Sequence, residues 1–482
     1  MGEPVIIVDG AHLTAADIVA IAYRQDEVVV SAIGTERASA SSAYANQVSA
    51  HRPIYGRSTG VGANRTISLT DPAGQALGLL RSHATSAGPL RSPERVRAML
   101  GVRLNQLAAG GSGASPAVLD GLLQMLRLDA LPPVRELGTL GTADLPALAT
   151  TALALAGEVA TTPALTPLVL GIGDALPFMS SNAATIADAA LALAELRTLA
   201  DAALVISALT FTAVDGNAEA FAVAVEQVTP FDGARAVCRG LRQLVGDRPP
   251  ARIQDPFGLR ALPQVQGAFL DRLAELEAVT VAMANAPSEN PVLLPLTGVA
   301  HHGGFHAAYL AQALDSMRLA LGQSAQLALA RVTMFAEPAN TGLAPFLGDG
   351  TAGASGAMII EYVAASALAE LRALAHPVAL HTVTLSRGVE EGASFASIAA
   401  THSLSALASY RTMLACELVL AMRCIRMRTV SPPPTLTEAF ELCAVLSDDV
   451  TDRELTADIA TAEALLSELA QTMSADAAGP SA

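Results

Sequence analysis

The chain has 482 residues, of which 51% are hydrophobic and 4% aromatic; it has no tryptophan and no lysine, so all 29 basic residues are arginine. With 45 acidic residues its net charge is −16, which argues against nucleic acid or an anionic membrane as a partner. Length allows two to four domains or one elongated one, and abundant alanine and leucine favour helices over strands.

The first half of the chain predicts helices joined by polar loops. Residues 1–65 combine two strand-like runs, VIIVDG and EVVVSAI, with short helical patterns and a loop ending in YGRSTGVGANR. From Gln75 to Leu128 the pattern is helical, interrupted at SAGPLRSPE and AAGGSGASP, where Ser or Pro marks the next helix start. Apolar helices are then predicted over Leu145–Ala160 and Ala183–Thr212.

The second half predicts a helical bundle. The Pro- and Gly-rich segment GDRPPARIQDPFGLRALPQVQG reads as a structured loop, TVSPPPTLTEA starts a short C-terminal helical segment, and SADAAGPSA is predicted to be a disordered tail. The fold class is all-α with a long central bundle. We expect an N-terminal region at 1–200, the bundle at 201–430 and a C-terminal segment at 431–482. The predicted bundle helices of this half cover 268–284, 305–335, 357–374 and 395–427.

Other site classes have little support. The N-terminus lacks a basic segment followed by a long apolar one, which is unlike a signal peptide, and no stretch resembles an uninterrupted membrane span. His301, His302 and His306 come nearest to a metal cluster, but two glycines interrupt them, so no metal site is predicted. The cysteines fit no zinc spacing and are expected to be buried thiols of a cytoplasmic protein: Cys238, Cys416, Cys424 and Cys443.

Polar residues concentrate in four loops, Tyr55–Arg65, Leu140–Asp144, Gln254–Arg260 and Ser386–Ser394. Each loop alone has an ordinary structural explanation. A Tyr before glycines is more often a packed turn than a base, Gln-Asp-Pro is usually a helix start, and two adjacent glutamates are usually a solvated pair. Their order along the chain is more informative.

Nine motifs carry a family resemblance. In order they are YGRSTGVG, LRSHATSAG, LPPVRELGTLGTADLPALA, SSNAAT, QDPFGLRALPQVQGA, NAPSENPVLL, GGFHA, LAHPV and VEEGAS. From Leu13 to Cys424 the chain resembles the histidine and phenylalanine ammonia-lyases and the related aminomutases. The resemblance implies an aspartase/fumarase-like helical fold, and a homotetramer whose active sites combine loops of three chains.

The resemblance also implies a chemistry. In the family an Ala-Ser-Gly triad cyclises and loses water to form an electrophilic methylidene-imidazolone group. A Tyr removes the β-proton of the amino acid, an Arg holds the carboxylate, and an Asn and a second Tyr assist at the prosthetic group.

Several residues match the family's positions. Tyr55 matches the catalytic base, Asn182 the Asn beside the prosthetic group, and Glu390 the acid of the late loop. For substrate binding, Ser82 and His83 match the selectivity pair of histidine-type lyases. Gln254 and Arg260 match the positions near the prosthetic group and the carboxylate.

Two departures affect the chemistry. Phe257 stands where the family has the second Tyr, and Gly141-Thr142-Ala143 stands where it has the triad, with one residue lost just upstream. Alignment on the preceding glycines would instead put the loss inside the triad. The Cβ of Ala143 restricts the turn that cyclisation needs, and dehydrated Thr142 would carry an extra methyl group. We therefore predict that the loop forms no prosthetic group and that the protein uses no cofactor.

The charges of the site do not depend on the triad. Asp144 looks like the N-cap of a helix with Pro146 in its first turn, and such a helix start favours an anion. Arg260 suits a carboxylate, and Arg57 is expected to add a cation beside Tyr55. Nearby arginines and helix starts should lower the pKa of Tyr55 toward useful basicity.

Three functions are compatible with these residues. The favoured one is an enzyme on the ammonia-lyase fold that works without the prosthetic group, by Tyr-based proton transfer on a small carboxylate- or carbonyl-bearing substrate. Specialised metabolism is its expected setting. The reaction could be an elimination, conjugate addition, isomerisation or cyclisation. The alternatives are an ammonia-lyase or aminomutase with an atypical Gly-Thr-Ala-derived group, and a non-catalytic binding or scaffold protein. The expected partners are a small molecule and three further copies of the chain, without nucleic acid or membrane.

Overall fold

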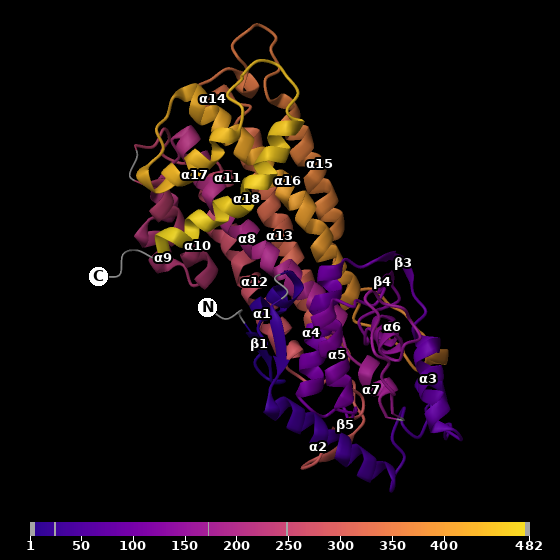
Figure 1. Cartoon of the computed structure of the whole chain (residues 1–482). Coiled ribbons are helices and arrows are strands. Elements are labelled where there is room, and N and C mark those ends of the chain that lie inside the picture. The colour runs from indigo at the N-terminus through magenta and orange to yellow at the C-terminus, as the bar shows by residue number, and fades with distance from the viewer. Residues whose placement is uncertain (1–4, 24–25, 172, 247–248, 478–482) are drawn as a thin grey trace. The chain divides into compact units, whose positions relative to one another are not determined.

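The computed structural model describes residues 5–23, 26–171, 173–246 and 249–477, and its long helices confirm the predicted all-α class (Figure 1). The chain divides into two compact units. Unit 1 comprises residues 1–194, 276–315 and 377–401, and unit 2 comprises 195–275, 316–376 and 402–482. The three consecutive segments expected from the sequence do not coincide with this division, because the chain passes repeatedly between the units.

Unit 1 begins with the two predicted strands. β1 (Val5–Val8) pairs in parallel with β2 (Glu27–Val30), and α1 (Ala15–Tyr23) connects them. α4 (Pro93–Ala108) packs against α1 and against α5 (Ala117–Leu128). The side chains of α4 are buried along most of its length, so this helix forms the centre of the layer.

A second group of helices in unit 1 carries the loops of interest. α3 (Pro72–His83), α6 (Leu145–Leu155) and α7 (Ala175–Met179) pack against one another. The remaining elements of this unit are α2 (Ala32–Ser49), η1 (Gly62–Asn64), β3 (Ala87–Leu90), β4 (Arg135–Leu137), β5 (Val292–Leu294), β6 (Gly298–Ala300) and η4 (Ser386–Gly388).

Two antiparallel strand pairs, β3 with β4 and β5 with β6, were not predicted. Each strand is three or four residues long. The sequence of β3, Ala-Gly-Pro-Leu, has no alternation of buried and exposed positions, and all four residues are exposed. Such strands depend on their partner and leave no periodic signal in the sequence.

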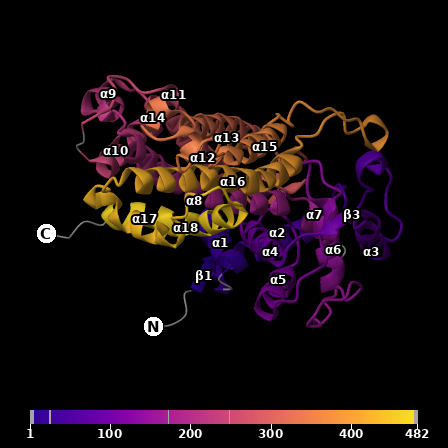
Figure 2. The same ribbon diagram turned by 90° about the horizontal axis from the view of Figure 1, so that it is seen from above.

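Unit 2 is a helical bundle, which is visible from two directions in Figures 1 and 2. Its long helices are α8 (Ala183–Val214), α12 (Leu262–Ala284), α13 (Ala308–Met334), α15 (Met358–Leu374) and α16 (Ala396–Arg428), and all but α15 have one end in unit 1. Inside this bundle Arg331 of α13 makes a bidentate ion pair with Glu417 of α16, at 2.6 and 2.8 Å, and Thr210 of α8 donates to Glu417 at 2.8 Å.

Shorter elements complete unit 2. They are η2 (Ala218–Phe221), α9 (Val223–Val228), α10 (Asp232–Val245), α11 (Phe257–Arg260), α14 (Pro338–Thr341), η3 (Pro345–Leu347), η5 (Pro434–Leu436), α17 (Thr437–Leu442), η6 (Cys443–Val445) and α18 (Thr456–Ala477). α18 is longer than the short segment expected, and it includes Ser474–Ala477 of the predicted tail. The tail residues 478–482 and the loop residues 247–248 lie outside the described residues.

Two predictions, one about the cysteines and one about membrane-spanning segments, can be compared with the structure. The four cysteines are free and buried, as predicted, and burial raises the pKa of Cys416, Cys424 and Cys443 to about 12. In the described part of the chain, α16 alone is long and apolar enough to cross a membrane, but 61% of its most apolar window is buried inside the protein. That burial is typical of a core helix.

Candidate active site

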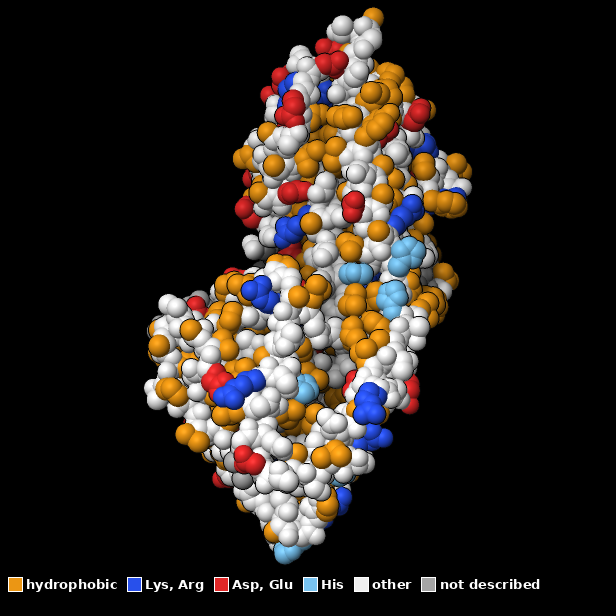
Figure 3. Space-filling view, turned by 90° about the vertical axis from the view of Figure 1, so that its right-hand side faces the viewer, with side chains coloured by type: hydrophobic (Ala, Val, Ile, Leu, Met, Phe, Trp, Pro, Cys, Tyr) orange, Lys and Arg blue, Asp and Glu red, His pale blue; other side chains and the backbone are white. Residues whose placement is uncertain are grey.

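A cavity of about 1110 Å³ lies in unit 1. Its lining comes mainly from the loop at 53–66, the turn at 142–145, the segment 290–306 and the loop 386–392. A hollow bordered by apolar, charged and histidine side chains is visible in Figure 3. Of the residues predicted from the sequence, this cavity brings together Tyr55, His83, Thr142, Ala143 and Glu390.

Tyr55 is held at both its backbone and its hydroxyl group. Its hydroxyl oxygen accepts a hydrogen bond from the Gly62 N–H at 2.8 Å, and its own N–H donates to Nε2 of His301 at 3.3 Å. Burial raises the pKa of Tyr55 and the charge of Glu390 raises it further, against the lowering effects of the Gly62 hydrogen bond and Arg65. The lowered pKa expected for Tyr55 from the sequence is therefore wrong, because the burial of the phenol could not be read from the sequence.

The cation expected beside Tyr55 is engaged elsewhere. Arg57 is 9% exposed, and its guanidinium donates to Asn46 Oδ1 at 3.0 Å and to the carbonyl oxygens of Gly113 at 2.7 Å and Gly173 at 3.5 Å. It does not line the cavity. These bonds favour a structural role for Arg57 over substrate binding.

Arg65 is the residue that sequence reasoning missed. It is exposed, it lines the cavity, and within the described ranges its guanidinium makes no hydrogen bond or ion pair. It ends the η1 turn, where its N–H donates to the Gly62 oxygen at 3.1 Å. In the sequence, Arg65 is marked only as the last residue of the motif YGRSTGVGANR. A polar residue at the end of a loop is too common to indicate a functional role.

Hydrogen bonds from neighbouring segments hold the backbone of Gly141-Thr142-Ala143, the altered loop, in place. The Gly141 carbonyl oxygen accepts from the Ala307 N–H at 3.1 Å and from the Ser394 hydroxyl at 2.7 Å. The Ala143 N–H donates to Asn182 Oδ1 at 3.1 Å. Three separate segments of unit 1 therefore fix the backbone of residues 141–143.

The residues of this loop do not fit the family's ring-forming triad. Gly141 has φ +80°, and a Cβ there would collide with the Ser394 hydroxyl and come within 2.6 Å of the Ala396 nitrogen, so the Ala of the triad has no room. Ala143 has φ +82° where the triad has Gly, a conformation that costs an L-residue about 1–2 kcal/mol. The methyl group of Thr142 adds hindrance at the middle position.

Asn182 joins the loop to another wall of the cavity. While its Oδ1 accepts from Ala143, its Nδ2 donates to the Phe305 carbonyl oxygen at 2.5 Å. The side chain is fully buried and is not part of the cavity lining. Asn182 thus positions two lining segments relative to each other.

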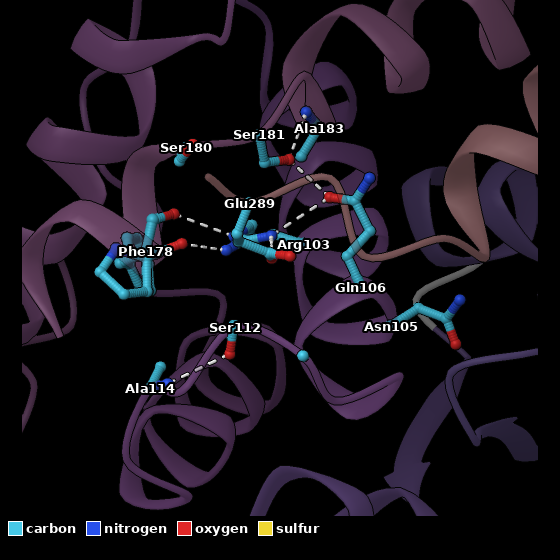
Figure 4. A network of polar contacts seen from close by, with 12 residues as sticks. Arg103, Asn105, Gln106, Ser112, Ala114, Phe178, Ser180, Ser181, Ala183 and Glu289 are labelled. Atoms are coloured by element: carbon cyan, nitrogen blue, oxygen red, sulfur yellow. Dashed lines mark hydrogen bonds and ion pairs between the residues drawn. The ribbon is translucent and has the colours of Figure 1, made fainter. Parts of the chain in front are cut away.

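A buried network fixes the segment that precedes Asn182 (Figure 4). Arg103 of α4 pairs with Glu289 at 2.7 Å and donates to the Phe178 carbonyl oxygen at 2.9 Å. The Ser181 hydroxyl donates to Gln106 at 2.5 Å. Burial raises the pKa of Glu289 despite the opposing charge of Arg103. Sequence reasoning did not find this network, because its members come from three distant segments.

Asp144 occupies the predicted N-cap position of α6, and Pro146 lies in the first turn. Its carboxylate, however, makes no capping bond to α6. It accepts instead from the Thr185 N–H and hydroxyl, both at 2.8 Å, at the start of α8. Burial raises the pKa of Asp144 to about 6, against the lowering effect of Arg91.

The other predicted residues lie outside the cavity lining. Ser82 is exposed and its hydroxyl donates to the Leu79 carbonyl oxygen at 2.9 Å. Gln254, Phe257 and Arg260 belong to unit 2. Gln254 is exposed, Phe257 is 68% exposed, and Cζ of Arg260 lies 4.5 Å from the centre of the Phe257 ring. Phe257 lacks the hydroxyl of the family's Tyr, but its ring still gives Arg260 an aromatic surface.

No group of three or more His, Cys, Asp or Glu side chains is placed to hold a metal ion in the described part of the chain.

The chain is similar to known sequences over most of its length. The family model described as "Aromatic amino acid lyase" matches residues 13–444. A histidine ammonia-lyase of Geobacillus thermodenitrificans is 31% identical over 492 residues, which cover 96% of this chain and 98% of the relative. The histidine ammonia-lyase of Geobacillus kaustophilus is 33% identical over 449 residues, covering 88% and 89%.

Solved structures share the fold. A tyrosine aminomutase from Streptomyces globisporus superposes with a TM-score of 0.92 at 24% identity, covering 98% of both chains. The ergothioneine-degrading enzyme ergothionase from Treponema denticola gives a TM-score of 0.90 at 23% identity, covering 98% of this chain and 99% of that one. The match of the family model over most of the chain confirms the resemblance found in the motifs: the chain belongs to the aromatic amino acid lyase family.

Proposed function

We propose that this protein is an enzyme that works without the methylidene-imidazolone group and transfers protons through Tyr55 on a small substrate bearing a carboxylate or carbonyl. The observation that carries the proposal is the cavity shared by Tyr55, Arg65 and Glu390 and the loop whose residues do not fit the ring-forming triad. A scaffold protein would have no need for a phenol, a cation and a carboxylate around one cavity.

The chemistry follows from the charges around Tyr55. Because its pKa is raised, the phenol is neutral at pH 7 and acts first as a proton donor. The Gly62 N–H then stabilises the phenolate. The Glu390 carboxylate accepts the proton that the substrate loses on forming the enolate and can pass it on to the phenolate. Arg65 holds the substrate's carboxylate, and the uncapped N–H groups of α6 stabilise an enolate. An elimination, conjugate addition, isomerisation or cyclisation can each use these groups.

The predicted site residues that belong to unit 2 have their proposed role in an assembly of several chains. We propose that Gln254, Phe257 and Arg260 act in an active site that is completed within a homotetramer, as the family resemblance implies. Arg260 suits this role because, in the described ranges, its guanidinium has no carboxylate partner and its Nε is buried without a hydrogen bond. Loss of Arg260 should then weaken binding by about 2–5 kcal/mol. The cytoplasmic location and a place in specialised metabolism stay predictions.

Intact mass and ammonia release test the proposal together. We expect the denatured chain to have its encoded mass, and histidine, phenylalanine and tyrosine to release no ammonia. Ring formation would remove two water molecules per chain. A deficit of two waters located to residues 141–143 would contradict the proposal.

A second candidate, an ammonia-lyase or aminomutase with a Gly-Thr-Ala-derived group, has one observation in its favour. The Gly141 carbonyl receives two hydrogen bonds, and these polarise it toward attack by a nitrogen. The relatives that are 31–33% identical are histidine ammonia-lyases. The mass measurement separates the two candidates without knowledge of the substrate.

A further inference from the structure

Arg57 stands two residues after Tyr55 in one tight turn, but the two side chains have different surroundings. The N–H groups of Arg57 and Ser58 donate to the Ile54 carbonyl oxygen at 3.1 and 2.9 Å, so the chain folds back on itself here. Tyr55 is half-buried and lines the cavity, whereas Arg57 is buried and does not line it. The turn therefore presents a phenol to the cavity and holds a guanidinium in the protein interior.

The guanidinium of Arg57 joins this turn to three other segments of unit 1. Its acceptors are Asn46 in α2, the Gly113 carbonyl oxygen before α5 and the Gly173 carbonyl oxygen before α7. Within the described ranges no carboxylate forms an ion pair with it. Burial lowers the pKa of Arg57, and the charge of Asp174 opposes this effect. Because burying a cation without a paired anion costs free energy, the position of Arg57 calls for a reason beyond packing.

The guanidinium fits closely against Gly173. A Cβ on Gly173 would lie 1.8 Å from Nη2 of Arg57, so a side chain there would have to displace the guanidinium. The turn meets the same segment a second time, because a Cβ on Gly56 would lie 2.0 Å from Cδ2 of Leu176. Leu176 belongs to α7 and lines the cavity. The residues on both sides of the Tyr55 side chain's attachment are thus fitted to the segment that begins α7.

We propose that Arg57 is a positioning residue for Tyr55: its guanidinium ties the turn to the segment before α7 and so fixes where the phenol enters the cavity. This inference rests on the proposed function, in which Tyr55 transfers the proton. The charges that shift the pKa of Tyr55 are those of Glu390 and Arg65, so Arg57 acts through position and not through its charge. An arginine that the sequence indicated as substrate-binding thereby receives a different task.

Fluorotyrosine labelling tests the proposal without a substrate. The chain has six tyrosines, so the labelled protein should give six ¹⁹F resonances, and the one that Tyr55→Phe removes belongs to Tyr55. Arg57→Ala should move this resonance at least halfway toward its position in the urea-denatured protein. The resonances of Tyr362 and Tyr410, which belong to unit 2, should stay in place. An unmoved Tyr55 resonance in Arg57→Ala would overturn the proposal.

Chemical rescue separates positioning from a general loss of structure. Guanidinium ion at about 10 mM, far below the molar range in which it denatures proteins, should fill the space left in Arg57→Ala and return the Tyr55 resonance to its wild-type position. Urea with sodium chloride at the same concentration has the planar shape without the charge and should leave the resonance displaced. Failure of guanidinium to return the resonance would refute the positioning role.

Arg97→Ala is the matched control for the loss of a buried arginine. Arg97 is 3% exposed, belongs to the same unit and donates to the carbonyl oxygens of Ile21 and Leu126, outside the turn. Its removal should lower the melting temperature but leave the Tyr55 resonance in place. A Tyr55 resonance that moves equally in Arg97→Ala and Arg57→Ala would show a general effect of buried arginines and overturn the proposal.

A second variant keeps the arginine and displaces it, and it decides the question if Arg57→Ala does not fold. The methyl group of Gly173→Ala would occupy the place of the guanidinium, so the Tyr55 resonance should move in the same direction. Gly78→Ala is its control, since a Cβ there meets no atom within 4 Å. The double variant should show no larger shift than Arg57→Ala alone, because both changes remove one interaction. Additive shifts would contradict the proposal.

A further readout measures the consequence for proton transfer. With a substrate that gains deuterium from D₂O on the wild-type enzyme, Arg57→Ala should slow incorporation about 100-fold, because a displaced catalytic group loses its alignment, and should leave substrate binding nearly unchanged. Guanidinium should restore the rate. Unchanged incorporation by Arg57→Ala would overturn the role. If the wild-type protein transfers no proton at all, the proposed function fails, while the resonance experiment still decides whether Arg57 positions Tyr55.

Discussion

The hydroxyl oxygen of Tyr55 accepts a hydrogen bond from the N–H of Gly62, seven residues further along the same loop, at 2.8 Å. The next N–H, that of Ala63, donates to the Ser386 hydroxyl at 3.0 Å. The loop that carries Tyr55 is thus fastened both to itself and to the loop that carries Glu390. Movement of either loop would change the charges that Tyr55 experiences.

Replacement of Tyr55 by Phe should abolish proton transfer and leave substrate binding nearly intact, because the ring stays and only the proton-bearing oxygen is lost. Incubation of a panel of small carboxylic acids in D₂O, followed by NMR, detects the deuterium that turnover introduces at carbon. Tyr44→Phe is a suitable control, since Tyr44 is a tyrosine of the same unit outside the cavity lining. Equal incorporation by Tyr55→Phe would reassign the proton to Glu390.

The ionisation of Tyr55 should respond in opposite directions to its two charged neighbours. Since Glu390 raises the pKa and Arg65 lowers it, Glu390→Gln should shift the tyrosinate absorbance transition to lower pH, and Arg65→Gln to higher pH. Subtracting the titration of Tyr55→Phe isolates this group. Arg387→Gln is the matched control, because Arg387 lies in the neighbouring loop but outside the lining. Identical transitions in the two charge variants would show that Tyr55 lies outside their influence.

Asp144 should make the protein less stable as the pH rises through about 6. Its folded-state pKa of about 6 exceeds the 3.8 of an ordinary Asp, so the folded protein binds this proton more tightly than the unfolded chain. The stability from this group is full below pH 3.8 and is lost as the pH rises through 6, by up to about 3 kcal/mol. The melting temperature of Asp144→Asn minus that of the wild type should therefore increase from pH 5 to pH 8. The exposed Asp120→Asn should track the wild type, and parallel curves for all three proteins would refute the role of Asp144.

The protein should assemble as a tetramer of its 49.2 kDa chains. Apolar side chains gather on the surface in Figure 3, and large exposed ones include Phe231, Tyr362 and Ile253, the last 93% exposed. A single chain in water would leave this area uncovered. Sedimentation at micromolar concentration measures the mass. A stable monomer would contradict both the assembly and the proposed participation of Arg260 in a shared site.

Helices that bury a face could be predicted from the sequence, and helices of the predicted bundle were found close to their expected bounds. The helix expected from Ala183 spans Ala183–Val214, and the one expected at 357–374 spans Met358–Leu374. Both segments are rich in alanine and other apolar residues that favour a helix, which is a local property. The strands β3 and β4 escaped prediction because their pairing is a contact between distant segments.

The motifs could identify the loops of the candidate site. Tyr55, His83, Thr142 and Glu390 line one cavity, and their roles there stay predictions. What each side chain touches was not predictable. Arg57 and Arg65 belong to the same loop, but Arg57 donates to backbone carbonyl oxygens and Arg65 lines the cavity. Only the conformation of the folded loop distinguishes them.

Under the proposed function, the crowding at Gly141 limits how this protein could be redesigned into a ring-forming lyase. Exchange of the three residues for Ala-Ser-Gly would press a methyl group against Ser394 and the backbone nitrogen of Ala396. The engineer would instead have to lengthen the loop by a residue before Gly141, so that the alanine falls at a roomier position, and to trim Ser394 as well. Under the proposed function, a library built only from point substitutions at these three residues would therefore miss the conversion.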